Sequence, residues 1–527
     1  MRETAPEQVW NEYEKGLRYN DQINLADTVK VNEDFFIGKQ WEGVQANGLP
    51  TPVFNVIKRI VLYLVATTAT DNVAMAVNPL SEAYPSAGEV PQVEAICDVI
   101  GDQFTALFEH NKITAAIRDF MRDAAVRGDG CIYSYFDPEA ETGQTAKGSI
   151  RIELIENTRV FFGDPNVQDV QSQPYILMTR RERLEDVRQE VEGYGGDPDL
   201  VRPESDELGD RFDAMTDDKV TTVTRFWRED DGAVWCTKTV KEGFVRAPWD
   251  TGMERYPIVW MSWDQVSNSY HGQAAVTGLI PNQVFINKAF AMTMISLMTT
   301  AYPKVVYDRT RVAKWSSAVG QAIAVNGGDV STVAKTIDPP AISPQVGQFI
   351  QLAIDLTKEL MGATDAALGN VRPENTSAIL ALQKSSSVPM ELVKQELYQA
   401  VEDMGLIWMD QMRAYYGTRL VQYNGQTVSF DFGTLEQVPL SLKLDVGGSA
   451  YWSEIAQLQT LDNLLASGHI TIIDYLERLP NGYVSGQQEL IDTIKQREQG
   501  AQMGAVPAGQ DLMGQDLTAE QMPPMGI

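Results

Sequence analysis

Cysteine is scarce in this chain, with only three among 527 residues. Cys97, Cys131 and Cys236 are widely spaced, odd in number and absent from any CxxC pair. This arrangement argues against a disulfide framework and against a structural zinc site, both of which need closely spaced sulfur ligands. We therefore expect three buried thiols.

Sequence signatures of catalysis are also missing. The chain has no GxxxxGK[ST], no GxSxG, no HExxH, and no GxGxxG between a predicted strand and helix. Without a phosphate-binding loop, any motor activity would have to come from a partner. We predict that the protein is not an enzyme and binds no cofactor. The three histidines lie in separate segments, each expected at a helix end or on the surface: His110, His271 and His469.

A calcium-binding pattern is absent from the most acidic part of the chain. Residues 181–218 contain 14 acidic residues and five arginines, but lack the alternating ligands, central glycine and terminal glutamate of an EF-hand loop. We expect this segment to begin as a helix and continue as an exposed loop, and we predict no metal site.

Basic residues are too few to neutralise the acidic ones. The 43 lysines and arginines face 72 aspartates and glutamates, which gives a formal net charge of −29. Proteins that grip nucleic acid neutralise phosphates with basic side chains, so this charge disfavours a basic-groove binder. It leaves two readings open: an acidic lining that surrounds DNA without holding it, or a solvated surface that keeps a large assembly soluble.

No apolar run is long enough to span a membrane uninterrupted. Residues 60–70 supply about half of the roughly 20 apolar residues that a span needs. Residues 284–302 are longer but carry Asn287 and Lys288 near their start. We expect both segments to be buried or interface helices and predict no membrane association.

The first half of the chain mixes helical and strand patterns, so we predict an α+β fold. Helical spacing of apolar residues or flanking turn signals indicate helices over residues 6–30, after Pro52, over 92–110 and over 112–127. Alternating or β-rich patterns indicate strands over residues 131–136, 150–155, 175–180, 219–229, 233–239 and 258–261.

The middle of the chain has the most informative order of parts. Residues 278–300 form a helix that is apolar over much of its circumference, and such a helix must be covered on most sides. A strand at 304–307 follows, then an extended piece at 315–325, a turn at Asn326-Gly327-Gly328 and a second extended piece. Residues 304–343 carry five basic and three acidic side chains, so this small module differs in charge from the rest.

A second helix, a loop and a long helix come next. The helix opens at Pro344 and stops at Gly362, and residues 363–376 have neither strand nor helix periodicity. The long helix reaches residue 416, and we expect a kink at Pro389, which removes a backbone donor. Residues 499–527 are rich in Gly, Met, Pro and Gln, and we expect them to be disordered in isolation.

This arrangement resembles the portal proteins of tailed double-stranded DNA bacteriophages, over roughly residues 21–500. The resemblance depends on the order of several short segments, none of them a catalytic signature. They are Phe35-Phe36-Ile37-Gly38-Lys39-Gln40-Trp41, then Gly272-Gln273, Pro281-Asn282-Gln283 and Ile286-Asn287, and last Gly369-Asn370 leading to Thr376-Ser377.

The resemblance implies a portal architecture. Its parts would be a wing (1–264 and 418–449), two stem helices (272–301 and 344–361), a clip (302–343), a tunnel loop (363–376), a long kinked wing helix (376–416), a helical crown (452–498) and the tail (499–527). In the family, twelve copies form a ring at one capsid vertex of the virion, which would be assembled in the host cytoplasm.

The resemblance also implies partners and contact residues. Double-stranded DNA would pass through the channel, facing Asn370, Arg372, Glu374 and Asn375, with Arg372 as the expected phosphate contact. For each of these four, a helix-capping or loop-stabilising role is the alternative. The clip would contact the terminase large subunit and the neck or tail adaptors, and the ring would also meet capsid and scaffolding proteins. The expected clip contacts are Arg309, Arg311, Lys314 and Trp315.

Two other classes of protein remain open at this point. A structural tail or neck adaptor ring would share the acidic, motif-free composition but would not need a DNA-facing loop between two helices. An enzyme would need a convergent polar site, which the sequence does not reveal.

Overall fold

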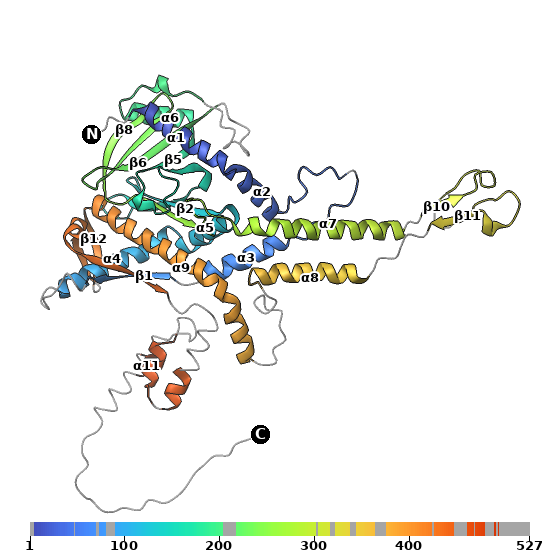
Figure 1. Cartoon of the computed structure of the whole chain (residues 1–527). Helices are drawn as coiled ribbons and strands as arrows, with labels where there is room; N and C mark the ends of the chain where they lie inside the picture. Colours follow the sequence, from blue (N-terminus) through green and yellow to red (C-terminus); the bar gives the residue numbers. More distant parts are fainter. Residues whose placement is uncertain are drawn as a thin grey trace, which may run out of the picture. The chain divides into compact units, whose positions relative to one another are not determined.

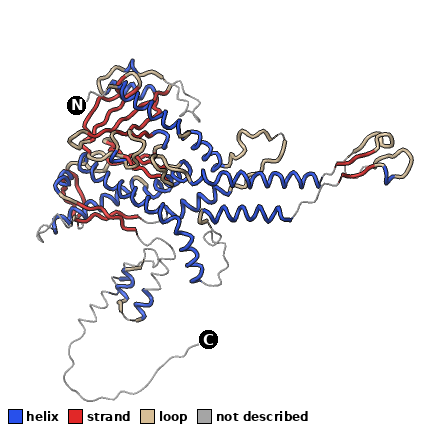
Figure 2. The backbone as a smooth tube through the Cα atoms, viewed as in Figure 1, coloured by secondary structure: helices blue, strands red, loops and turns tan. Residues whose placement is uncertain are grey.

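The computed structural model describes residues 5–46, 48–69, 73–80, 90–203, 218–301, 304–316, 322–337, 344–363, 376–423, 426–446, 461–467, 469–479, 490–491 and 494. The chain divides into two compact units, Met1–Gly447 and Gly448–Ile527. The first unit combines helices with antiparallel sheets, which confirms the α+β class (Figures 1 and 2).

The N-terminal helical segment is two helices, α1 (Pro6–Gln22) and α2 (Leu25–Ile37). The prediction of a single helix over residues 6–30 is wrong, because Asn24 adopts a left-handed conformation with φ of 50°. Asparagine tolerates this conformation better than most residues, so the chain can turn there and restart. Gly38, with φ of 98°, ends α2.

The largest hydrophobic core of the first unit joins helices that are far apart in the chain. α3 (Val56–Ala69), α4 (Val90–His110) and α5 (Ile113–Arg127) meet α9 (Thr376–Tyr415) there. Trp408 of α9 is fully buried, and its ring lies 6.2 Å from that of Phe104 on α4 and 5.8 Å from that of Phe108. All three cysteines are buried, as predicted.

A five-stranded antiparallel sheet forms a second layer, in the order β4-β5-β6-β7-β8. α1 packs on it through Val9 and Tyr13. Glu12 of α1 accepts a 2.7 Å hydrogen bond from Nε of Arg225, whose guanidinium lies over the rings of Tyr175 and Trp227. This buried ion pair fixes the helix on the sheet. The members are β4 (Val160–Phe162), β5 (Tyr175–Arg183), β6 (Lys219–Arg228), β7 (Val234–Val240) and β8 (Gly243–Met253), with α6 (Leu184–Gly193) against β8.

The remaining strands form smaller sheets. β2 (Asp129–Asp137) lies between β3 (Ser149–Leu154) and β9 (Ile258–Ser262). The six predicted strands are confirmed as β2, β3, β5, β6, β7 and β9. Strands that the patterns did not predict are β1 (Val73–Pro79) with β14 (Leu440–Val446), β12 (Thr418–Tyr423) with β13 (Gln426–Asp431), and β4 and β8 of the larger sheet.

Two helices and a hairpin follow β9 in the chain. α7 (Ala275–Ala301) includes Pro281, and α8 (Pro344–Leu360) packs against it. Both helices agree with the sequence prediction. β10 (Lys304–Tyr307) pairs with β11 (Ala334–Ile337), which lies in the second extended piece. The described residues of the 315–325 piece contain no strand.

α9 begins at Thr376 and continues through Pro389 as one helix. Figure 1 shows that α9 changes direction along its length. In the second unit, residues 461–466 and α11 (Ile472–Glu477) are helical, and Leu476, Leu479 and Ile491 form a small core. The predicted tail, residues 499–527, lies outside the described residues.

Candidate functional site

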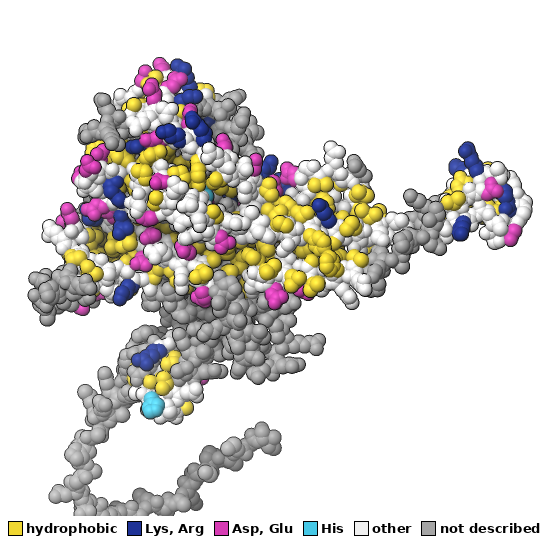
Figure 3. All heavy atoms as spheres, in the orientation of Figure 1, with side chains coloured by type: hydrophobic (Ala, Val, Ile, Leu, Met, Phe, Trp, Pro, Cys, Tyr) yellow, Lys and Arg dark blue, Asp and Glu magenta, His cyan; other side chains and the backbone are white. Residues whose placement is uncertain are grey.

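The most unusual surface of the first unit is the free face of α7 and α8. Large apolar residues on α7 are exposed, with Met292 at 66% and Leu297 at 56% of the full residue area. On α8, Phe349 is 58% and Leu352 is 51% exposed. In Figure 3 apolar side chains gather over this helix pair.

An aromatic contact joins the two helices of this surface. The rings of Phe285 on α7 and Phe349 on α8 meet edge to face, 5.6 Å apart. Single exposed leucines are ordinary, but a contiguous apolar face of this kind marks a protein interface. We call this face the α7–α8 surface; its exposed apolar members are Phe285, Met292, Met294, Leu297, Met298, Val346, Phe349, Leu352, Leu356 and Leu360.

Membrane insertion would be another way to cover apolar helices. Among the described residues, no helix combines the length and apolar character that crossing a bilayer requires. α7 carries one charged residue, Lys288, which is exposed near the middle of the helix.

Buried amide side chains fix α7 to the segment that connects α2 to α3. Nε2 of Gln283 donates to the carbonyl oxygen of Phe54 at 2.8 Å and to Oδ1 of Asn287 at 3.0 Å. Nδ2 of Asn287 donates in turn to Oε1 of Gln40 at 2.6 Å. We call Gln40, Gln283 and Asn287 the amide chain.

The amide chain also caps a helix. Oε1 of Gln283 accepts hydrogen bonds from the backbone N–H groups of Val56 and Ile57, at 2.9 and 3.3 Å. These are among the first N–H groups of α3, which have no partner within the helix. The amide chain thus connects three of the short segments on which the resemblance was based: one precedes α3, and the other two lie next to each other in α7.

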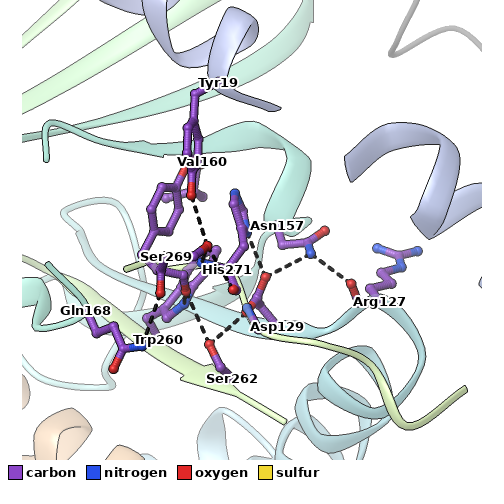
Figure 4. A network of polar contacts seen from close by, with 12 residues as sticks. Tyr19, Arg127, Asp129, Asn157, Val160, Gln168, Trp260, Ser262, Ser269 and His271 are labelled. Carbon is purple, nitrogen blue, oxygen red and sulfur yellow. Dashed lines mark hydrogen bonds and ion pairs between the residues drawn. The ribbon is translucent and has the colours of Figure 1, made fainter. Parts of the chain in front are cut away.

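A second buried polar network surrounds the carboxylate of Asp129, where β2 begins (Figure 4). Oδ1 accepts from Oγ of Ser262 at 2.8 Å and from the backbone N of Gly272 at 2.7 Å. Oδ2 accepts from Nδ2 of Asn157 at 3.1 Å and lies 2.7 Å from Nδ1 of His271. One carboxylate therefore ties together the start of β2, the end of β9, Asn157 and the segment that leads into α7.

Gly128 permits this junction. Its φ is 104°, and a Cβ there would lie 2.7 Å from the carbonyl oxygen of Gly272. Both the backbone conformation and the close approach therefore require glycine. Tyr19 of α1 adds a further connection, since its ring stacks on His271 and its hydroxyl lies 2.9 Å from Oγ of Ser269.

The helix-end or surface position predicted for His271 is wrong. The side chain is only 2% exposed and pairs with Asp129, because the chain folds back between β9 and α7 and buries the ring against Trp260 and Tyr270. Nδ1 must donate to the carboxylate, and Nε2 has no hydrogen-bond partner within the described part of the chain.

This pair does not amount to a catalytic triad. Oγ of Ser262 donates directly to Asp129 and not to the imidazole, so the network has no hydroxyl aligned for activation by His271. No group of three or more His, Cys, Asp or Glu side chains in the described ranges could hold a metal ion. The geometry is that of a structural junction.

The cysteines lack the environment of reactive thiols. Burial raises the pKa of Cys97 to about 11, with the nearby carboxylates of Asp98 and Glu94 acting in the same direction. Burial likewise raises the pKa of Cys131 and of Cys236. All three stay protonated near neutral pH, and a protonated thiol is a poor nucleophile.

β10, β11 and the described residues between them, which we call the hairpin module, contain all four residues predicted as clip contacts. Nε of Arg311 donates to the carbonyl oxygen of Gly327 at 3.1 Å, and its Nη2 donates to that of Asp329 at 3.0 Å. The ring of Trp315 stacks on Tyr307 at 5.4 Å. Arg311 and Trp315 therefore hold the module together, whereas Arg309 and Lys314 are exposed.

Replacing Arg311 by methionine should loosen the turn that it spans without unfolding the rest of the chain. The variant loses hydrogen bonds to two carbonyl groups and to Oγ1 of Thr332, while its aliphatic portion remains. We expect amide hydrogen exchange to accelerate by at least about tenfold over residues 326–332. Lys314→Met is the control, and equal exchange in the two variants would contradict the internal role of Arg311.

The residues predicted to face DNA, Asn370, Arg372, Glu374 and Asn375, lie outside the described residues. Asp129, His271 and the amide chain carry well-defined contacts but were not predicted as a site. Gly128-Asp129-Gly130 has the local pattern of a turn before the predicted strand at residues 131–136. A polar residue flanked by glycines at the start of a buried strand is the signal that could have identified Asp129.

Comparison with known protein families finds a matching family model. The family model described as phage P22-like portal protein matches it over two overlapping ranges, residues 18–232 and 182–422. These ranges include the Asp129 junction, the amide chain, α7, the hairpin module and α8. A search of curated proteins finds no match.

Proposed function

The chain belongs to the phage P22-like portal protein family, and from this premise we propose that its copies form a closed ring at one vertex of the capsid. Membership of this family supports a role as a phage portal protein and as a component of the virion. The proteins of this family are structural. We further propose twelve copies around a central channel through which the genome enters and leaves.

The observation that carries this proposal is the exposed α7–α8 surface. In an isolated chain, its leucine, methionine and phenylalanine side chains face water. Removing apolar surface from water stabilises a protein by about 25 cal/mol per Å². Contact between neighbouring copies would remove that area from water on every subunit. A ring uses two different surfaces of one chain, each complementary to the other, and closes when the rotation between copies returns to the start.

The portal architecture assigns roles to the elements. α7 and α8 would be the stem, residues 302–343 the clip, and the sheets with α1–α6 and α9 the wing, completed by residues 418–449. Residues 452–498 would be the crown. The Asp129 junction would then lie where the wing meets the stem, and the amide chain would fix the angle of α7 against α2 and α3.

The clip would contact the terminase large subunit during packaging and the neck or tail adaptors afterwards, while other parts of the ring meet capsid and scaffolding proteins. The module's excess of basic side chains supports this, because the remainder of the chain is strongly acidic. Arg309 and Lys314 are the better candidates for partner contacts, since their charged groups are exposed.

Mass measurement under native conditions tests the ring. The purified chain should give a species near twelve times 58.5 kDa. A monomer or dimer at micromolar concentration would contradict the proposal.

The segment between α8 and α9 would be the tunnel loop that faces DNA, with Arg372 contacting phosphate and Asn370, Glu374 and Asn375 beside it. Deleting residues 364–375 and joining the helices with a short Gly/Ser linker should leave rings intact but abolish filled capsids. DNA protected from nuclease inside capsids provides the measurement. Arg372→Ala should reduce filling by less than the deletion.

The deletion also distinguishes a portal ring from the tail or neck adaptor ring that the sequence left open. Unchanged packaging with intact rings would favour a neck or tail adaptor ring without a DNA-gating loop. Loss of the rings themselves would mean that the segment serves assembly.

A further inference from the structure

The segment that connects α2 to α3 presents apolar side chains to solvent although its base is firmly held. We call residues 41–54, described except for Asn47, the 41–54 loop; in Figure 1 it follows α2. Val44 and Leu49 are each 55% exposed. Each donates its backbone N–H within a tight turn, to the carbonyl oxygens of Trp41 and Ala46.

The base of the 41–54 loop is closed by side-chain hydrogen bonds. Nε1 of Trp41 donates to the carbonyl oxygen of Pro52 at 2.9 Å, and Nδ2 of Asn55 donates to that of Phe36 at 2.9 Å. The amide chain then fixes both ends of the loop to α7, through Gln40 and the carbonyl of Phe54. A preorganised loop loses little conformational entropy on binding, which favours a docking element.

The 41–54 loop packs on α7 of its own chain through an aromatic contact. The rings of Phe54 and Phe290 lie 4.1 Å apart, so the loop and the helix share one apolar layer. Lys288 and Met292 are exposed four positions apart on one helical face of α7, which Phe285 borders beside α8.

The 41–54 loop and α7 each carry a single charged residue, and the two charges are opposite. Glu42 is the sole charged residue of the 41–54 loop, and Lys288 is the sole charged residue of α7. Both are exposed, and across the described residues neither forms an ion pair. An apolar surface with one positive charge and another with one negative charge are complementary.

We propose that the 41–54 loop of one copy docks on the exposed face of α7 of a second copy, with Glu42 paired to Lys288 across the contact. Val44 and Leu49 would cover the apolar side chains beside Lys288. The contact uses two different surfaces of the chain, as a closed ring requires. This inference rests on the proposed ring and names one of its contacts.

Charge reversal tests the pairing. Lys288→Glu and Glu42→Lys would each place like charges together at every contact, and each should raise the concentration for half-assembly by at least about tenfold. Both side chains are exposed, so the variants should fold normally. The matched controls are Lys15→Glu and Glu139→Lys, exposed charges on α1 and in the turn after β2, which should assemble like the unaltered chain.

Mixing the two variants distinguishes a contact between chains from one within a chain. In an equimolar mixture the two variants can alternate around the ring. At one contact the two substituted side chains would then face each other, and their charges would again be opposite. At the next contact the unaltered Lys288 of one variant would meet the unaltered Glu42 of the other. Assembly should therefore recover in the mixture, and also in the double variant Glu42→Lys/Lys288→Glu. Native mass spectrometry over a concentration series provides the measurement.

The outcomes separate this inference from the proposed function. Recovery by the double variant but not by the mixture would place the pair within one chain and overturn the docking. Single variants that assemble like the controls would also overturn it while leaving the ring in place. Failure of the unaltered chain to form any ring would instead overturn the proposed function.

Discussion

A chain carrying Leu352→Glu should remain a folded monomer at concentrations where the unaltered protein is fully assembled. Leu352 projects from the α7–α8 surface and is 51% exposed, so a carboxylate there is hydrated in the isolated chain. We expect its free energy of unfolding to change by no more than about 0.5 kcal/mol. In a ring, the same carboxylate would lose its hydration within an apolar contact, at a cost of several kcal/mol.

The penalty recurs at every contact of the ring, so its effect on assembly is far larger than its effect on one chain. Native mass spectrometry should show the ring peak replaced by monomer, with an unchanged circular dichroism spectrum. Leu420→Glu on β12 is the matched control, since Leu420 is 53% exposed away from these helices. Rings of normal size from Leu352→Glu would exclude this part of α8 from the subunit contact.

Asp129→Asn should destabilise the first unit by about 3 kcal/mol. The carboxylate is fully buried and accepts from Asn157, Ser262 and the backbone of Gly272 while pairing with Nδ1 of His271. An amide in its place turns an NH₂ group toward these donors, so at least one buried polar group loses its partner. The imidazole also loses the charge beside it.

Urea unfolding monitored by tryptophan fluorescence should show the loss as a lower midpoint. Hydrogen exchange should also accelerate in residues 262–274, because Asp129 holds the segment that enters α7. Asp137→Asn at the other end of β2 is the control, since its carboxylate is only partly buried and bonds to one backbone N–H. Equal midpoints for the two variants would show that the buried network contributes little.

Local patterns predicted the long helices and many of the strands. α7 was predicted from a long stretch of apolar residues at helical spacing, and α8 from helical spacing with a proline at its start and a glycine after its end. β8 was not predicted because its sequence, GFVRAPWDTGM, contains glycines and a proline that normally interrupt a strand. β1 and β14 were not predicted, and each is stabilised by pairing with the other, far away in the chain.

The polar networks could not be found from local patterns. Asp129, Asn157, Ser262 and His271 have no common spacing, and Gln40, Gln283 and Asn287 come from two distant segments. Their roles arise when the fold brings buried donors to buried acceptors, which must be paired because water is excluded. The order of short segments pointed to the family, but not to the hydrogen bonds that join three of them.

From residue order alone, the chain could be recognised as an acidic α+β protein with two apolar helices around a small basic module and with the segment order of a portal protein. Those properties follow from composition and periodicity, which act over a few neighbouring residues. The α7–α8 surface, the fixed 41–54 loop and the burial of His271 depend on which side of each element the rest of the chain covers. That is a property of long-range packing, and it left the apolar faces of α7 and α8 exposed on the isolated subunit.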